Sequence, residues 1–280
     1  MYRLAFFVLL AATSSLRAAD HATFGAYTAA PGDAIEQGVR FTMRLQTTSR
    51  QGSEVLDESS TEVQRQQTRR VTATDVRDER VVGAEVTFLQ STANHNGEAS
   101  IEPVTGKSYR CLRDGDRLEV LTAEGDLPPM EEYELVARAM ESLGTESPLT
   151  RFLAGRTVRV GESLVLPAEV AQKALGFDSK VGMVETFRLT LESVEPLEGK
   201  NVARFAAQIE AVGGGTQQMR LIVDGTFAVD EATCRIVSAD LAGPIAMSGL
   251  RGTGDKGYQL DGRGQMQIEL TARYRDAVRR

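Results

Sequence analysis

Hydrophobic and polar residues alternate with a period of two along much of the chain, which is typical of β-strands that bury one face. Three segments show this alternation most clearly. Their apolar positions are Val39, Phe41, Met43 and Leu45 in the first, Phe187, Leu189 and Leu191 in the second, and Met266, Ile268, Leu270, Ala272 and Tyr274 in the third. Glycine-containing turn sequences fall between such segments, as β-hairpins require. The pattern predicts long antiparallel strands.

The hydrophobic period changes to that of a helix between the two β regions. Pro129 is suited to a first helical turn, and Gly144 is suited to end the helix. Two shorter helices are expected, one from Ser147 to Leu153 and one starting at Pro167 and ending at Gly176. The apolar face of the first helix consists of Met130, Tyr133, Val136, Ala137, Met140 and Leu143.

The order of these elements predicts an α+β protein that is mostly antiparallel β. We expect a curved sheet, or half-open barrel-like β halves, with the helices inserted in the middle of the chain. Both one continuous sheet and two packed β halves fit the sequence. The expected regions are a signal peptide (1–18), an N-terminal β region (19–126), a helical connector that packs on the sheet (127–180) and a C-terminal antiparallel β region (181–275). The three regions that follow the signal peptide are expected to form one cooperative domain.

Two local features refine this expectation. The segment from Glu54 to Val76 is very polar, so it is expected at a sheet edge or projecting into solvent. Asp224-Gly225 and Asp261-Gly262 lie inside strand-like runs, where glycine indicates a bulge or a tight bend in place of a hairpin turn.

The first residues have the features of an export signal. Arg3 precedes an apolar run from Leu4 to Ala12 that is too short to span a bilayer, and small residues follow it. We expect cleavage near Ala18 and Ala19 and a periplasmic or secreted protein.

Composition and charge restrict the partners. The chain is 41% hydrophobic and 25% charged, with a formal net charge of −7. An acidic chain does not favour binding to nucleic acid or electrostatic docking on anionic lipid. No later apolar stretch approaches the ~20 residues of a membrane helix, so no membrane span is expected in the mature chain. An apolar small molecule or an envelope protein remains as the expected partner.

The chain contains two cysteines, Cys111 and Cys234. An oxidising compartment permits a disulfide between them. Two buried thiols that pack as small apolar groups are an equally good interpretation.

No catalytic, metal or nucleotide signature is present. The only histidines are His21 and His95, both expected in solvated segments, so no zinc site and no Ser-His-Asp set can be assembled locally. We therefore expect a protein that is not an enzyme and has no cofactor or metal.

Met130, Tyr133, Val136 and Met140 are the candidate ligand-binding residues, because their stripe is suited to lining an apolar cavity. Ordinary core packing is the simpler interpretation of the same stripe. Three functions follow in order of preference. They are a non-enzymatic protein that binds an apolar ligand or lipid in a cavity between sheet and helices, a structural or protein-interaction component of the cell envelope, and a carboxylate-based hydrolase.

One phrase carries a family resemblance. The segment from Arg156 to Pro167 contains the step Val160-Gly161-Glu162 between strand-like residues. Together with the layout of the chain, it resembles uncharacterised secreted bacterial β-rich proteins of unknown function. The resemblance implies an envelope or secreted protein and supplies no catalytic residues.

Overall fold

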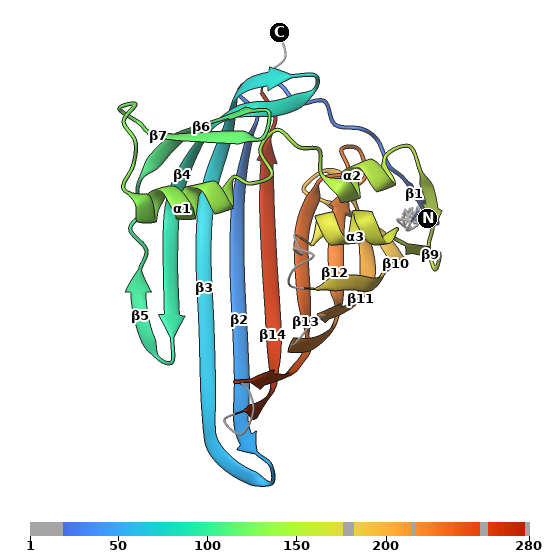
Figure 1. Ribbon diagram of the computed structural model, residues 1–280. Coiled ribbons are helices and arrows are strands. Elements are labelled where there is room, and N and C mark those ends of the chain that lie inside the picture. The colour runs from blue at the N-terminus through green and yellow to red at the C-terminus, as the bar shows by residue number, and fades with distance from the viewer. Residues whose placement is uncertain (1–18, 176–181, 214–216, 253–256, 278–280) are drawn as a thin grey trace, which may run out of the picture.

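The computed structural model describes residues 19–175, 182–213, 217–252 and 257–277. The expected signal peptide and Gly176 lie outside these ranges. Figure 1 shows one broad sheet with the helices on one of its faces. The N-terminal strands are β1 (His21–Thr23), β2 (Ala34–Gln51), β3 (Glu54–Arg77), β4 (Arg80–His95), β5 (Glu98–Ile101), β6 (Ser108–Asp114) and β7 (Arg117–Thr122). The C-terminal strands are β10 (Met183–Leu197), β11 (Lys200–Gly213), β12 (Gln217–Asp230), β13 (Ile236–Arg251) and β14 (Tyr258–Arg275).

The middle of the chain contains α1 (Met130–Ala139), α2 (Pro148–Leu153) and α3 (Ala168–Ala174), with β8 (Thr157–Arg159) and β9 (Ser163–Val165) between the last two. The connector expected to be helical therefore also contains two short strands. α1 ends before Gly144, the expected end, because the chain turns back onto the sheet, where the Gly144 N–H donates to the Val81 carbonyl at 2.8 Å.

Twelve strands form a single sheet in the order β7-β6-β4-β3-β2-β14-β13-β12-β11-β10-β9, with β5 paired to β4. Every pairing is antiparallel. The pairing of β2 with β14 joins the N-terminal strands to the C-terminal ones, for example at Phe41 and Ile268. The expectation of a mostly antiparallel α+β protein is confirmed, and the sheet is continuous.

Three glycines allow the sheet to bend. Gly225, Gly243 and Gly264 belong to the neighbouring strands β12, β13 and β14. A methyl group added to Gly264 would lie 1.9 Å from the carbonyl oxygen of Arg44, and one added to Gly225 would lie 2.0 Å from that of Asp240. Only glycine permits so close an approach of adjacent strands. As expected, Asp224-Gly225 and Asp261-Gly262 lie within strands and form no hairpin turn.

The polar segment from Glu54 to Val76 forms β3, which pairs with β2 and β4. Its expected position at a sheet edge is wrong, because two long strands flank it. The hairpin between β2 and β3 nevertheless extends beyond the rest of the sheet (Figure 1), and residues 51–60 are exposed on both faces. The expected projection into solvent is confirmed for this end of the segment.

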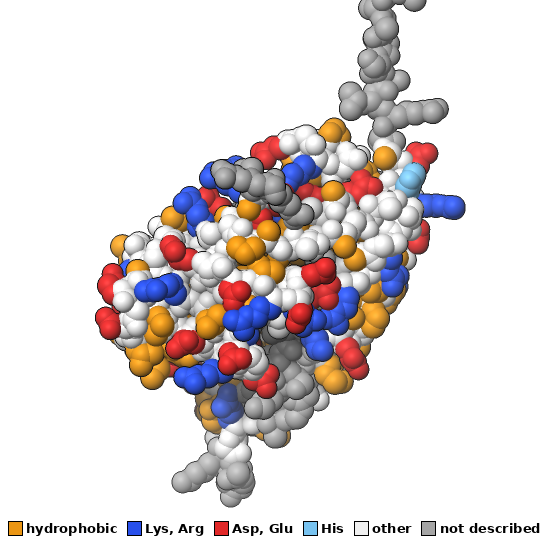
Figure 2. Space-filling model, turned by 90° about the horizontal axis from the view of Figure 1, so that it is seen from above, with side chains coloured by type: hydrophobic (Ala, Val, Ile, Leu, Met, Phe, Trp, Pro, Cys, Tyr) orange, Lys and Arg blue, Asp and Glu red, His pale blue; other side chains and the backbone are white. Residues whose placement is uncertain are grey.

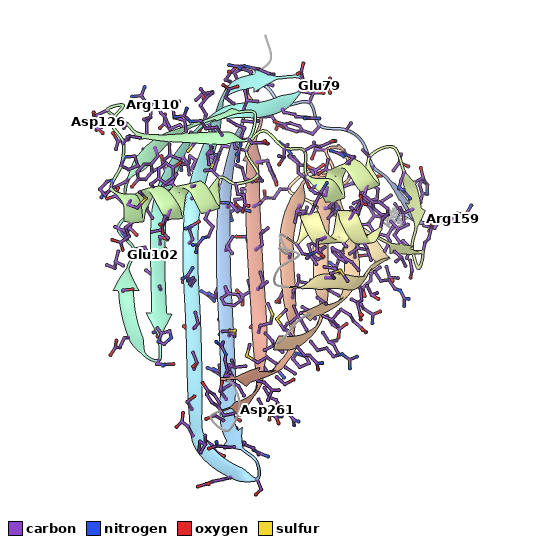
Figure 3. All side chains as sticks on the ribbon, in the orientation of Figure 1. Glu79, Glu102, Arg110, Asp126, Arg159 and Asp261 are labelled. Carbon is purple, nitrogen blue, oxygen red and sulfur yellow. The ribbon has the colours of Figure 1, made fainter. Side chains whose placement is uncertain are left out.

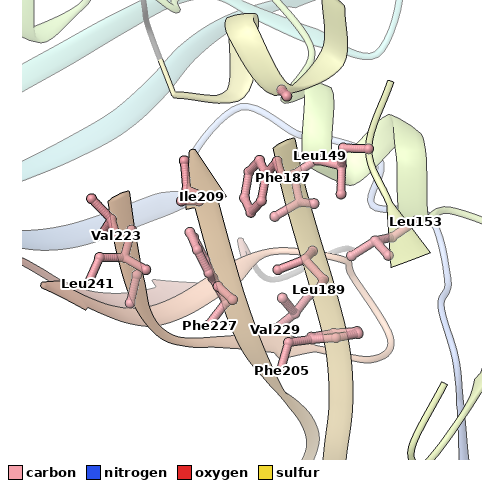
Figure 4. Close-up of a cluster of buried hydrophobic side chains, with 14 of the residues drawn as sticks. Leu149, Leu153, Phe187, Leu189, Phe205, Ile209, Val223, Phe227, Val229 and Leu241 are labelled. Atoms are coloured by element: carbon pink, nitrogen blue, oxygen red, sulfur yellow. The ribbon is translucent and has the colours of Figure 1, made fainter. Parts of the chain in front are cut away.

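The helices cover two separate hydrophobic cores on the same face of the sheet. α2 and α3 pack on the C-terminal strands, where Leu149 and Leu153 of α2 point toward Phe187 and Leu189 of β10 (Figure 4). α1 covers the N-terminal strands, where Val136 packs with Val86, Phe88 and other buried residues. The strands between the two cores carry no helix along most of their length (Figure 1).

Candidate functional site

An apolar strip runs between the two cores on the face of the sheet that carries the helices. It is formed by three cross-strand pairs, Val39 with Leu270, Phe41 with Ile268, and Met43 with Met266. Residues directly opposite each other in antiparallel strands project to the same face. All six side chains are half-buried. The strip is a strand pair with an apolar face that none of the three described helices covers.

The strip is continuous with the C-terminal core and ends at β3 on its other side. Met266 and Leu270 pack against buried residues of that core. On β3, by contrast, the residues facing the strip are polar, with Arg65 opposite Phe41, Gln67 opposite Val39 and Arg69 opposite Gln37. The apolar strip therefore has a polar border on the N-terminal side.

Arg69 is held by neutral amides at this border. Its Nε and Nη2 donate to Oε1 of Gln37 at 3.2 and 2.8 Å, and its Nη1 donates to Oε1 of Gln67 at 3.3 Å. Burial lowers the pKa of the guanidinium to about 10. Among the described residues, no carboxylate lies within ion-pair distance of it.

A hydrogen-bonded path continues from this border toward α1. Nε2 of Gln67 donates to Oγ of Ser91 at 3.2 Å. The Ser91 hydroxyl in turn donates to the carboxylate of Glu102, which lies just below α1 in Figure 3. The path fixes the Gln67 amide so that its oxygen faces Arg69.

A cavity of about 360 Å³ opens beside this path, between α1, β3, β4 and the turn after β5. Its lining has both signs of charge, with arginines from β3 and α1 and three glutamates. The lining residues are Arg65, Ala93, Ser100, Ile101, Glu102, Pro103, Glu131, Glu134, Leu135 and Arg138. Charges of both signs are also interspersed on the surface drawn in Figure 2. The cavity is therefore a polar pocket next to the apolar strip.

Glu132 fixes α1 over this region. Its carboxylate accepts hydrogen bonds from Nζ of Lys107 and from the hydroxyl of Tyr109, each at 2.6 Å. These bonds hold the pKa of the Glu132 carboxyl below its usual value. Burial raises the pKa of the Tyr109 hydroxyl. The sequence presents Glu132 only as a first-turn helix charge, and its partners lie in or next to β6.

The four residues of α1 proposed from the sequence as a ligand site differ in how deeply they are buried. Val136 and Met140 are buried in the N-terminal core, and Tyr133 packs against it and donates to the Leu118 carbonyl at 3.2 Å. Met130 is 71% exposed. None of the four lines the cavity under α1. Their packing is that of core residues with one exposed end, and ligand binding by this stripe stays a prediction.

The two cysteines are free, buried thiols, which corresponds to the interpretation of thiols that pack as small apolar groups; the disulfide that the sequence permits is not formed. Cys111 lies in the N-terminal core and Cys234 in the C-terminal one. Burial raises the pKa of Cys111 to about 12 and that of Cys234 to about 11.

Metal-ligating side chains do not gather among the described residues, where no group of three or more His, Cys, Asp or Glu is placed to hold an ion. His21 and His95 are both exposed. In the same part of the chain, no helix is long and apolar enough to cross a membrane.

The sequence predicted the apolar residues of the strip but not the polar residues of its border. Alternation marked the apolar positions of β2 and β14, but it assigned them to a buried face. Arg65, Gln67 and Arg69 were missed altogether. The signal that could have found them is the inward-facing series of β3, in which Val63 and Val71 flank these three polar residues.

Comparisons with known proteins identify no family. No protein-family model matches the chain, and no curated protein does. Among solved structures, a chain from "Lipid-protein interactions in lipovitellin" matches over 90% of this chain with 8% identity and a TM-score of 0.37. This chain spans 26% of that one. A chain from "Asymmetric conductivity of engineered proteins" matches over 84% of this chain and 99% of its own length, with 10% identity and a TM-score of 0.26.

Proposed function

We propose that this protein is an exported, non-enzymatic binding protein that holds the apolar chain of a lipid-like ligand on the strip between β2 and β14. The observation that carries the proposal is the set of six half-buried apolar side chains on strands that the described helices leave uncovered along most of their length. Contiguous apolar surface that faces water is uncommon in folded proteins, and it marks ligand grooves and partner sites. Export is proposed from the N-terminal sequence pattern alone.

The shape of the strip favours an elongated ligand. The strip follows two antiparallel strands, and beyond Met43 the next residue on the same face of β2 is Leu45, which is buried in the C-terminal core. From Val39 to Met43 the strip is about 13 Å long, at about 3.3 Å for each residue of a strand. Two of its side chains are methionines, whose flexible thioether chains adapt to irregular apolar surfaces. A single extended alkyl chain suits this length and flexibility.

A charge placed in the strip tests the proposal. The variants Phe41→Glu and Ile268→Glu should lower affinity for an uncharged alkyl ligand at least about tenfold, because burying a carboxylate against the chain is unfavourable. The measurement is displacement of Nile red by hexadecanol, supported by native mass spectrometry and organic extraction of protein exported to a bacterial periplasm and purified without detergent.

Thr42→Glu is the matched control. Thr42 lies next to Phe41 on β2, and its side chain projects to the opposite face. It should bind hexadecanol as the unchanged protein does. If the unchanged protein binds no alkyl ligand, or if both inner-face variants bind as well as the control, the strip is not a lipid site.

A further inference from the structure

Arg69 is a half-buried cation that has no carboxylate partner among the described residues. The residue is half-buried at the border of the strip, and its contacts are amide oxygens of Gln37 and Gln67. Removing a charge from water is costly unless a counter-ion compensates it. The nearest carboxylate along the hydrogen-bonded path is that of Glu102, and Gln67 and Ser91 separate it from Arg69. The site therefore holds a positive charge that no carboxylate of the described residues neutralises.

The guanidinium also has donors left over. An arginine carries five N–H groups in a rigid planar fork. Three hydrogen bonds go to the two glutamines. Two N–H groups remain for another acceptor, and a guanidinium pairs best with the oxygens of a carboxylate or a phosphate.

The position of Arg69 relates this charge to the strip. Gln37, which Arg69 contacts, is the inward-facing residue that precedes Val39 on β2. Gln67, its other contact, is directly opposite Val39. The guanidinium therefore lies at one end of the row Val39, Phe41, Met43, and a chain lying along that row would bring its head group to Arg69.

We propose that Arg69 binds the oxyanion head group, a carboxylate or a phosphate monoester, of a single-chain amphiphile whose alkyl chain occupies the strip. This inference rests on the proposed function and adds the class of ligand. Gln37 and Gln67 are positioning residues, since they orient the guanidinium and leave its free donors available. The exposed Arg65, four residues earlier on β3 and on the same face, is too solvated to supply the same desolvated charge.

A competition experiment separates the contribution of the head group to affinity from that of the alkyl chain. Nile red bound to the protein is displaced by palmitate, hexadecyl phosphate or hexadecanol, which share one chain length. In the Arg69→Met variant, the affinity for an anionic ligand should fall about tenfold to a hundredfold, the value of a hydrogen-bonded charge pair. Affinity for hexadecanol should stay the same. Comparing palmitate with hexadecyl phosphate shows which oxyanion the site takes.

Two further variants keep the test decisive. Arg70→Met removes the neighbouring arginine, whose side chain lies on the opposite face and pairs with Glu36 at 3.1 Å, and it should change no affinity. Arg69→Lys keeps the charge and loses the fork, so it should weaken anion binding less than Arg69→Met. It also replaces that variant if Arg69→Met does not fold.

The outcomes for the two proposals differ. If hexadecanol binds to the strip but Arg69→Met, or Arg69→Lys in its place, leaves both anions bound as before, the head-group assignment is overturned and the proposed function stands. An equal loss for all three ligands also overturns the assignment. If none of the three displaces Nile red from the unchanged protein, the proposed function fails and the assignment fails with it.

Discussion

Glu132 shows how one buried side chain sets the place of a helix. The residue is 7% exposed and binds both Lys107 and Tyr109 from the strand side. A carboxylate at this depth is stable only when its oxygens are hydrogen-bonded. The sequence predicts the helix and the first-turn charge, because both are local. It does not predict the partners, since these come from a separate part of the chain that only the folded sheet brings near.

The variant Glu132→Gln should lower the free energy of unfolding by about 1–3 kcal/mol, the usual cost of losing a charged hydrogen-bond acceptor. Urea denaturation measures it. Glu131→Gln, one residue earlier and exposed, should change stability by less than about 0.5 kcal/mol. Equal effects of the two variants would show that Glu132 does not fix α1.

The pH dependence of stability follows from the same carboxylate. Its folded pKa lies below the unfolded one, so its contribution is complete above the unfolded pKa of about 4.3 and is lost as the pH falls through the folded value. The difference in stability between the unchanged protein and Glu132→Gln should therefore shrink below about pH 4. A difference that stays constant on acidification would contradict this assignment.

At the scale of elements, the strands were predictable and their surroundings were not. The alternation of Val39, Phe41 and Met43 depends on the two-residue period of a strand, so the sequence predicts which side chains share a face. Whether another element covers that face depends on where the helices pack, and the connector is tied to the two ends of the sheet. The half-exposed strip follows from that placement.

The bend in the sheet gives a second test at this scale. The variant Gly264→Ala should lower stability by about 3 kcal/mol or more, because its methyl group would meet the backbone oxygen of Arg44, which cannot move without separating two strands. Gly262→Ala is the matched control on the same strand. Its methyl group would meet Cγ of Met247 at 2.6 Å, a flexible side chain, and should cost about 1 kcal/mol. Thermal unfolding of both variants measures the two losses of stability. Equal losses would contradict the role of Gly264.

At the scale of the whole molecule, two cores share one sheet. The sequence left open whether the β regions form one sheet or two, because strand pairing between distant segments leaves no local pattern. The β2–β14 pair resolves this, since it extends over nearly the full length of both strands. Disruption of this pair would expose the inner faces of both halves together.

The reactivity of the two thiols tests whether the two halves unfold together. Cys111 and Cys234 lie in different cores and are both buried, so neither should react with iodoacetamide in the native protein at pH 8. With increasing urea, both should become labelled with the same midpoint, as peptide mapping by mass spectrometry would show. Labelling of one cysteine at a clearly lower urea concentration would mean that the halves unfold separately.

The pairing of β2 with β14 also sets when the site comes into existence during biosynthesis. The two strands lie near opposite ends of the described chain, so their contact closes a very long loop, and such contacts form late and slowly. Until β14 arrives, β2 is an unpaired edge with an apolar face, a feature that favours aggregation. A chain truncated before β14 is therefore expected to lose its binding surface and to need protection by a chaperone.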